Sequence, residues 1–485
     1  WLRSEVGQLK PASLRQAILK RYGSDRTFSV PILTVLALAG KLGAGADAWR
    51  LVPQLPFELA ACPHQWFRWL RLPVVSYALP ALVAIGQVRH HHAPTRNPAL
   101  ASIRSALRAR TLQIARDMQP QSGGYLEAVP LTAFVVMSLI SAGAATDAIV
   151  ERGVAFLVAS ARKDGSWPID TNLATWVTTL SIAALEPQGG LADHDRSRIL
   201  RWLVDQQVAE EHPFTHARPG GWAWTNLPGG VPDADDTAGA LLALWQLGGA
   251  EQTDRATAGI RWLLDLQNRD GGIPTFCRGW GALSFDRSAP DLTAHALEAW
   301  NVWVEAVVMD LRREIAGAAA RAVAYLADQQ RPDGSWAPLW FGNQHVAGEL
   351  NLTYGTARVV SALATPLAQR FPPADQGHRR GVTWLLRAQN QDGGWGGGSG
   401  SPSSIEETGV ALDALGCSPD ASPGLTDAIH RGVRWLVEAT DEGRRTPACP
   451  IGLYFARLWY YEELYPLVWS LKGLSQARAC VALTP

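Results

Sequence analysis

Three aspartates lie within four residues in the sequence Asp233-Ala234-Asp235-Asp236, directly ahead of an apolar stretch. Carboxylates this close repel one another, so the cluster favours at least one protonated carboxyl group at neutral pH. A carboxylic acid that stays neutral at the wall of an apolar cavity can donate a proton. A single aspartate here would instead cap a helix by accepting backbone N–H bonds. With three aspartates after Pro232, proton donation and capping are equally good interpretations.

The composition sets only broad limits on function. Lys plus Arg and Asp plus Glu both number 44 among 485 residues, so charge gives no indication of a nucleic-acid partner. The longest apolar stretch, residues 72–86, contains two prolines and is shorter than the roughly 18 residues of a spanning helix, which favours a buried or interfacial helix. Five scattered cysteines without a CxxC pair predict neither a zinc site nor a disulfide framework. The chain starts at Trp1 in the middle of its pattern and without a signal peptide, which predicts a fragment of a longer protein.

A helical motif recurs along the chain. Four copies have an aromatic–Leu pair on an amphipathic helix and then a turn of the type Asp-Gly-Gly or Asp-Gly-Ser, where glycine permits the left-handed conformation that ends a helix. Two weaker copies have the aromatic–Leu pair alone. Successive aromatic–Leu pairs are 46 to 63 residues apart, which leaves room for two helices in each repeat. The pairs begin at Phe156, Trp202, Trp262, Tyr325, Trp384 and Trp435.

A second, apolar helix follows each amphipathic one. We expect these second helices to be buried, because they are apolar nearly all round. Buried helices that alternate with amphipathic outer helices predict an all-α fold, a double α/α barrel. An α6-α6 toroid would form the catalytic domain over residues 151–485, and residues 1–150 would form part of a second, incomplete α-barrel. The predicted inner helices are residues 174–185, 238–247, 292–303, 356–363 and 408–415.

The same pattern positions the acidic residues. Loops that enter the inner helices should line one mouth of the barrel, and they carry residues 233–236, 288–291, 349–351 and 406–407. The aspartate cluster therefore faces a deep, mostly apolar cavity. Glu406 and Glu407 occupy the repeat position of Asp235 and Asp236, and we interpret them as helix caps.

These motifs together resemble the squalene–hopene cyclase family of class II triterpene cyclases. The resemblance rests on the Gln-x-x-x-Gly-x-Trp copies and on Asp-x-Asp-Asp at the head of an inner helix. It implies that Asp235 is the proton donor and that Asp233 and Asp236 are the carboxylates that hold it. It further implies that His295 pairs with the donor and that Asp291 belongs to the same network.

The resemblance also implies a set of cavity residues around the substrate. Aromatic side chains attract a carbocation without reacting with it, each by about 0.5–2 kcal/mol. The chain departs from the family where Leu173-Ala174-Thr175 replaces a common Trp-Asp-Thr, and where Tyr77 replaces a tryptophan. The implied substrate-binding residues are Trp224, Phe276, Trp280, Trp340, Tyr454, Tyr461, Tyr77 and Pro130.

The implied activity is cyclisation of squalene to a hopene- or hopanol-type pentacycle, with no cofactor and no metal. Three alternatives stay open: a cyclase of oxidosqualene or of a shorter prenyl chain, a zinc-dependent protein prenyltransferase subunit with Cys277 and His295 as ligands, and a non-catalytic polyisoprenoid-binding barrel. Product analysis after incubation with squalene would test the first of these, and comparing turnover by wild type and by Asp235→Asn would test the last.

The resemblance also implies peripheral, monotopic contact with the inner face of the cytoplasmic membrane, and it is compatible with a homodimer. Residues 89–116 carry regularly spaced arginines and predict a basic amphipathic helix that could lie on anionic lipid. We interpret His90-His91-His92 as part of a solvated loop, because no further metal-ligand spacing follows.

Overall fold

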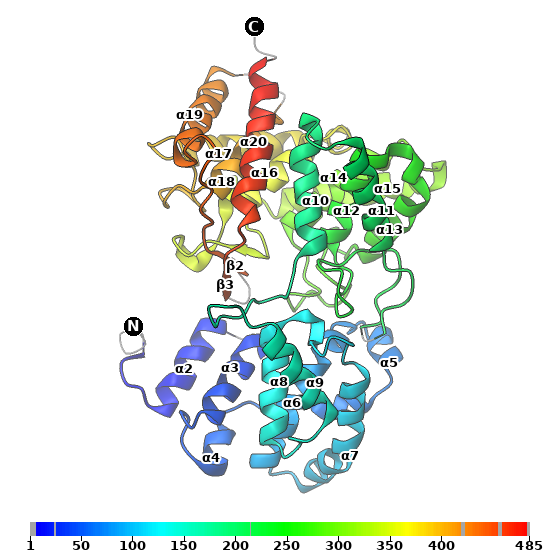
Figure 1. Ribbon diagram of the computed structural model, residues 1–485, viewed down its shortest axis with the longest axis vertical. Helices are drawn as coiled ribbons and strands as arrows, with labels where there is room; N and C mark the ends of the chain where they lie inside the picture. Colours follow the sequence, from blue (N-terminus) through cyan, green and yellow to red (C-terminus); the bar gives the residue numbers. More distant parts are fainter. Residues whose placement is uncertain (1–5, 24–25, 214, 419–421, 454–457, 483–485) are drawn as a thin grey trace. The chain divides into compact units, whose positions relative to one another are not determined.

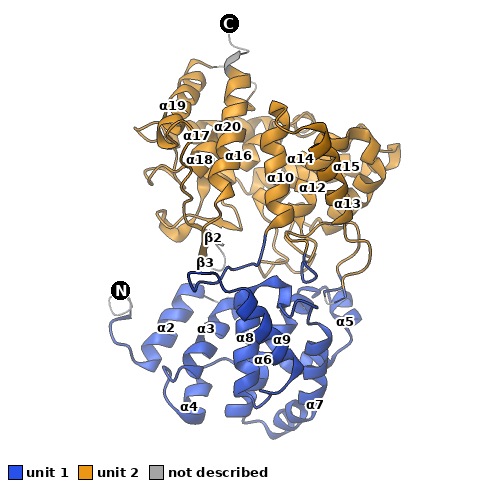
Figure 2. Cartoon of the chain, in the orientation of Figure 1, with its two compact units in different colours: residues 1–172, 213–216, 227–230 blue, residues 173–212, 217–226, 231–485 orange. Residues whose placement is uncertain are grey.

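A computed structural model describes residues 6–23, 26–213, 215–418, 422–453 and 458–482 of the chain. These residues are mostly helical (Figure 1) and divide into two compact units (Figure 2). Unit 1 comprises residues 1–172, 213–216 and 227–230, and unit 2 comprises residues 173–212, 217–226 and 231–485. The main boundary therefore lies at Asn172, beyond the predicted residue 150, because helix α9 (Ala148–Ala159) packs against α8 (Val129–Ser141) within unit 1.

Helix α6 (Val74–His92) lies at the centre of unit 1. It packs against α3, α4, α7 and α8, and Val83, Ile85 and Val88 are fully buried on it. The prediction of a buried helix over residues 72–86 is thus confirmed. None of the described helices has the length and apolar character needed to cross a membrane. The other helices of unit 1 are α2 (Pro11–Tyr22), α3 (Arg26–Leu38), α4 (Gly45–Arg50), η1 (Phe57–Ala61), α5 (His64–Trp69), α7 (Pro98–Asp117) and η2 (Tyr125–Glu127).

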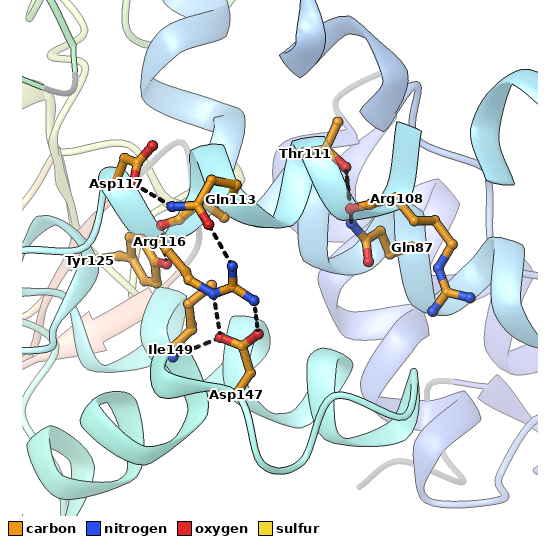
Figure 3. A network of polar contacts seen from close by, with 10 residues as sticks. Gln87, Arg108, Thr111, Gln113, Arg116, Asp117, Tyr125, Asp147 and Ile149 are labelled. Atoms are coloured by element: carbon orange, nitrogen blue, oxygen red, sulfur yellow. Dashed lines mark hydrogen bonds and ion pairs between the residues drawn. The ribbon is translucent and has the colours of Figure 1, made fainter. Parts of the chain in front are cut away.

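The predicted basic helix over residues 89–116 is shorter than expected, because a non-helical segment separates the end of α6 at His92 from the start of α7. Helix α7 begins at Pro98, where the Asn97 side chain accepts the N–H of Ala99 at 3.0 Å. Arg104 forms two hydrogen bonds of 2.9 Å with Glu58. The guanidinium group of Arg116 binds both carboxylate oxygens of Asp147 (Figure 3). These arginines therefore bind acidic partners inside unit 1.

The histidines before this break are also not in a solvated loop. They form the last turn of α6. His90 Nε2 lies 3.1 Å from Ser105 Oγ, and His92 Nε2 lies 2.9 Å from Ser141 Oγ. Helix α6 continues past residue 86 because both rings find hydroxyl partners on neighbouring segments.

In the described part of unit 2, six inner helices form a closed ring. Each packs against the next, and the last, α20, packs against both α18 and α10. This ring and the outer helices confirm the predicted α/α barrel. The inner helices are α10 (Ala174–Leu185), α12 (Ala234–Gly248), α14 (Pro290–Trp303), α16 (Leu352–Leu363), α18 (Ile405–Gly416) and α20 (Leu464–Ala482). The outer helices are α11 (Asp193–Asp205), α13 (Thr253–Leu266), α15 (Met309–Asp328), α17 (Pro373–Ala388) and α19 (Pro423–Ala439).

Four of the predicted inner helices begin two to four residues earlier than expected, because polar residues at their starts belong to the first turn. The sequence pattern does not predict helix α20, since the Gly-Gly or Gly-Ser turn that precedes each of the other inner helices is lacking there. Glycine permits its close packing: a Cβ atom on Gly473 would lie 2.3 Å from the Gly409 carbonyl oxygen of α18.

The repeated glutamines bind each turn to the next outer helix. Gln267 Nε2 donates to the carbonyl oxygens of Gly271, at 2.8 Å, and Ala318 on α15, at 2.9 Å. Gln330 and Gln389 make the equivalent pairs of bonds in their own repeats. Gly271 has φ +89°, and a Cβ atom there would lie 2.4 Å from the Arg321 carbonyl oxygen. The repeat motif is therefore a structural joint between successive helix pairs.

A small antiparallel sheet completes unit 2. Its strand order is β1 (Phe341–Gly342), β2 (Ile451–Leu453) and β3 (Leu458–Tyr460). Phe341 pairs with Leu453, and Ile451 pairs with Tyr460. The sheet thus connects the segment before α16 to the segment before α20.

Candidate active site

The aspartate cluster lies at the start of inner helix α12. Asp233 is the N-cap, and its Oδ1 accepts the backbone N–H of Asp236 at 2.9 Å. The Asp233 backbone also pairs with Trp222 of the preceding turn. Capping is therefore the role of Asp233, and it leaves Asp235 in the first turn with its side chain 18% exposed.

Asp235 and His295 form a close carboxyl–imidazole pair in this region. Asp235 Oδ1 lies 2.5 Å from His295 Nδ1, although the two residues belong to different inner helices, α12 and α14. The His295 side chain is 5% exposed. Since α12 and α14 are neighbours in the ring, the barrel itself brings together the acid and the histidine that the family resemblance implies.

The other three carboxyl groups of the cluster are buried, and burial changes their acidity. It raises the pKa of Asp233 to about 7, although Asp233 also accepts N–H bonds. Burial and then the neighbouring charge of Asp235 raise the pKa of Asp291 to about 7. Burial and then the proximity of Asp233 raise the pKa of Asp236 well above its ordinary value. A substantial fraction of these groups is therefore protonated near neutral pH, which limits the negative charge around Asp235.

Asp291 joins this cluster from the first turn of α14. Its two carboxyl oxygens lie 3.2 and 3.3 Å from the backbone N–H of Leu339, which donates to them. Leu339 precedes β1 and is itself buried. Asp291 thus holds the segment that leads into the sheet while it lies near Asp235.

Three of the predicted cavity aromatics lie together. The rings of Trp224 and Phe276 are 6.1 Å apart, and those of Phe276 and Trp340 are 6.2 Å apart, both edge to face. Trp340 Nε1 donates to Thr275 Oγ1 at 2.9 Å. This geometry is favourable for aromatic pairs and holds the rings in fixed positions.

A second aromatic group was not predicted from the sequence. Trp176 lies edge-on to His295 at 6.4 Å, and its Nε1 donates to the Tyr465 hydroxyl at 2.8 Å. Phe341 lies 4.2 Å from Tyr354, measured between ring centroids. Together, these rings place an aromatic surface beside the Asp235–His295 pair. The group consists of Trp176, Phe341, Tyr354, Tyr465 and Trp469.

A repeated threonine could have identified part of this group. In four repeats a threonine hydroxyl of the inner helix accepts the N–H of the residue that follows the glycine turn. The residue two positions before that threonine is Asp235, Asp291, Tyr354 or Glu406. Part of the site therefore comes from one register position of the repeat, which the sequence shows once the threonines are aligned.

The structure does not bring every predicted residue to these clusters. Trp280 is 67% exposed on the loop before α14, and Tyr461 is 64% exposed after β3. Tyr454 lies outside the described residues. Tyr77 is buried in α6, and Pro130 lies in the first turn of α8, so both belong to unit 1.

The capping interpretation of Glu406 and Glu407 is wrong. The cap of α18 is Ser404, whose Oγ accepts the N–H of Glu407 at 3.1 Å. Glu407 Oε1 accepts side-chain N–H bonds from Asn343 and Asn351, both at 2.9 Å. Glu406 Oε1 accepts the N–H of Cys449 at 2.6 Å, and burial raises the pKa of Glu406 to about 7.

The zinc alternative needs Cys277 and His295 in one ligand set. Cys277 Sγ instead contacts the Phe285 carbonyl oxygen at 4.0 Å. Among the described residues, no group of side chains that could hold a metal ion includes Cys277 or His295. The geometry around His295 is that of a carboxyl–imidazole pair.

Comparison with known proteins identifies the family. The model of the squalene-hopene cyclase C-terminal domain matches residues 172–478, well over half of the chain. The chain belongs to this family.

Several curated relatives are similar to this family member. Enfumafungin synthase efuA from Hormonema carpetanum is 29% identical over 303 residues, which cover 56% of this chain. A squalene–hopene cyclase from Bradyrhizobium diazoefficiens is 27% identical over 499 residues, covering 92% of this chain and 70% of the relative. The matched region spans only 22% of efuA. It spans 38% of the fusion protein fsoA from Humicola fuscoatra and 50% of a probable squalene–hopene cyclase from Sinorhizobium fredii.

A solved structure is similar to almost the whole chain. The ent-copalyl diphosphate synthase from Streptomyces platensis aligns with a TM-score of 0.55 at 20% identity, covering 96% of this chain and 92% of that one. At this identity the similarity shows the fold alone, and it agrees with the helical barrel described above.

Proposed function

We propose that this terpene cyclase starts polyene cyclisation by protonating a terminal alkene of squalene, and that the product is a hopene- or hopanol-type pentacycle. The observation that carries the proposal is the Asp235–His295 pair at 2.5 Å, set among buried carboxyl groups and aromatic rings. Asp235 is the proposed acid. Asp233, Asp236 and Asp291 are the proposed supporting groups.

The chemistry follows from the demands of a carbocation. As the O–H bond of Asp235 breaks, a C–H bond forms at the alkene and the positive charge passes to the neighbouring carbon. A protonated imidazole on His295 would stabilise the carboxylate that remains, which favours proton loss. Water must be kept away, because it would quench the cation.

Aromatic rings then stabilise the cation as it moves along the chain. Trp224, Phe276 and Trp340 form one such surface, and the group around Trp176 and Tyr354 forms a second. Each ring face contributes about 0.5–2 kcal/mol without forming a bond to the cation. Additional free carboxylates would capture the cation, so it is consistent that the pKa values of Asp233, Asp236 and Asp291 are raised.

The direct test is turnover by Asp235→Asn. Wild-type protein and the variant are incubated with squalene, and the extracted products are analysed by mass spectrometry. We expect cyclic triterpene from wild type and a rate at least about 10²-fold lower from the variant, since general acid catalysis is lost. The control is Asp310→Asn, which removes an exposed carboxylate from outer helix α15. Normal turnover by Asp235→Asn would remove the proposed proton donor.

A shorter prenyl chain is the alternative substrate. Drimenyl diphosphate synthase from Streptomyces showdoensis is 30% identical over 207 residues of this chain. Parallel incubations with oxidosqualene and geranylgeranyl diphosphate therefore accompany squalene. A product from either of these alone would assign the substrate to that class, and ligand binding without any product would support a non-catalytic polyisoprenoid-binding barrel.

We further propose that the protein docks on the cytoplasmic face of a membrane to obtain its lipid substrate. The support is a surface of unit 1 around helix α5, where Trp66 is 58% and Trp69 83% exposed beside the exposed Arg68 and Arg71. Tryptophan and arginine together favour the interface of an anionic bilayer. Sedimentation with phosphatidylserine vesicles should decrease in Trp66→Ser/Trp69→Ser and persist in Trp167→Ser. Equal binding by all three proteins would exclude this surface.

A further inference from the structure

A pocket inside the ring of unit 2 lies behind the Asp235–His295 pair. His295 lines it, together with residues from all six inner helices. It contains about 60 Å³ of space that the centre of a water molecule can reach, which is enough for more than one water. Most of its lining is apolar, including Leu242 of α12 and Val410 of α18, and a minority of it is charged. The pocket is therefore a largely apolar space with a few charged groups, in contact with the histidine of the proposed active site.

Four charged side chains also line this pocket. Glu298 of α14 lies 3.4 Å from Arg358 of α16, and Asp413 of α18 lies 2.7 Å from Lys472 of α20. The Glu298 and Arg358 side chains are only 15% and 14% exposed. Going round the ring from α14, the signs alternate: acid, base, acid, base. No net charge results, so the arrangement does not favour an anionic ligand.

The two bases stay ionised in this environment. Burial alone would lower the pKa of Arg358, but Glu298 and further acidic neighbours outweigh it and raise the pKa. Burial would likewise lower the pKa of Lys472, and Asp413 reverses the effect. Mostly buried ion pairs add little net stability compared with apolar side chains of the same volume. Stability of the fold alone therefore does not explain why four charged side chains occupy these buried positions.

Glu298 is the charge best placed to act on His295. The two residues are three positions apart on α14 and line the same pocket, so they lie on one face of the helix. His295 Nδ1 is directed at Asp235, which leaves Nε2 as the second ring nitrogen. A carboxylate on the pocket side stabilises the doubly protonated imidazole, directly by its charge and through water in the pocket.

We infer that Glu298, held by Arg358, is a positioning residue that favours the protonated form of His295 and thereby keeps an N–H directed at the Asp235 carboxyl group. This inference rests on the proposed function of Asp235. The other titratable or charged groups around His295 are Asp235 on α12, Asp291 on α14, Tyr354 on α16, Asp413 on α18 and Lys472 on α20, whereas α10 contributes the uncharged Trp176 and Thr179.

The test is the pH dependence of kcat/KM for cyclisation, measured from about pH 6 to about pH 9. In Glu298→Gln the alkaline limb should move to lower pH by about one unit, because a nearby carboxylate no longer favours the protonated imidazole. Glu298→Asp should restore most of the shift. Asp413→Asn removes a carboxylate paired with Lys472 and should cause a clearly smaller shift. An unmoved limb in Glu298→Gln, or an equal shift in Asp413→Asn, would overturn the inference.

Two further measurements keep the result unambiguous. If Glu298→Gln does not fold with Arg358 unpaired, the double variant Glu298→Gln/Arg358→Met removes both charges and should still move the limb to lower pH. Proton release on unfolding at about pH 7 needs no turnover: wild type should release more protons than either variant. Equal release would contradict the inference even if the proposed substrate is wrong, whereas absence of cyclic product from wild type would contradict only the proposed function.

Discussion

Replacing Asp291 by Asn should change how many protons the protein releases when it unfolds. Asp291 is buried at the start of α14, and burial and the nearby Asp235 raise its pKa to about 7. An unfolded aspartate has a pKa of about 3.9. Near pH 5.5 the folded carboxyl group is therefore almost fully protonated and the unfolded one almost fully ionised, a difference of about 0.9 proton per molecule. Asn keeps a carbonyl oxygen that can accept the Leu339 N–H, so the substitution removes the titration and retains an acceptor.

The sign of the accompanying stability change follows from the same shift. Because the folded pKa lies above the unfolded one, Asp291 contributes stability that is fully present below about pH 3.9 and is lost as pH rises through about 7. Between pH 5 and 6 the free energy of unfolding should fall by about 1.3 kcal/mol more in wild type than in Asp291→Asn.

The assay is unfolding in concentrated urea in a weakly buffered solution with a pH indicator. Wild type should release about 0.9 proton more than Asp291→Asn at about pH 5.5, and the difference should disappear above about pH 8. Denaturant titrations at two pH values give the stability difference independently. Identical proton release by the two proteins near pH 5.5 would show that Asp291 is already ionised in the folded state and would refute the electrostatic reasoning.

Three further predictions concern other parts of the fold. Gly271→Ala should lower the free energy of unfolding by more than about 2 kcal/mol, because a Cβ atom at this positive φ would contact a backbone oxygen. Gly400 also has positive φ but lies in open space, so Gly400→Ala should lower the free energy of unfolding by only about 1 kcal/mol. Equal losses in denaturant titrations would contradict this account. Asp147→Ala removes both the cap of α9 and the partner of Arg116. It should lower the melting temperature and reduce the free energy of unfolding by about 1–2 kcal/mol. An unchanged melting temperature would exclude a role for this contact. Glu406→Gln should stabilise the protein at about pH 8 by roughly 2 kcal/mol and much less at about pH 5, because burial favours the neutral form of Glu406; a pH-independent effect would argue for packing instead.

Much of the barrel could be predicted from the sequence because its repeats are periodic. The aromatic–Leu pairs and Asp-Gly turns identified five inner helices, and α10 has the predicted bounds of 174–185. Helix α20 was missed because no Asp-Gly turn follows the Trp435-Leu436 pair, and its position depends on close packing against α18 through Gly409 and Gly473. Such a contact between distant segments leaves no periodic signal.

The candidate site could be predicted only in part for a similar reason. Asp233, Asp235, His295 and Asp291 were named from motif and resemblance, and they lie together in the structure. Trp176 was missed because its contact with His295 depends on the closure of the ring, in which α10 meets α12 and α20. The exposed Trp280 shows the opposite error, since residue type alone does not reveal which way a loop turns.

The repeat also explains why an acid and its supporting groups meet at one place. The same register position of successive inner helices carries Asp235, Asp291, Tyr354 and Glu406, and in each repeat a threonine two residues later binds the preceding turn. A scaffold that supplies this position several times can vary one side chain without altering the helix start. Glu406 shares this position, but its carboxyl group binds the Cys449 N–H, whereas Asp235 faces a histidine from the neighbouring inner helix. The proposal that Asp235 is the acid therefore rests on the partner of its carboxyl group and not on its place in the repeat.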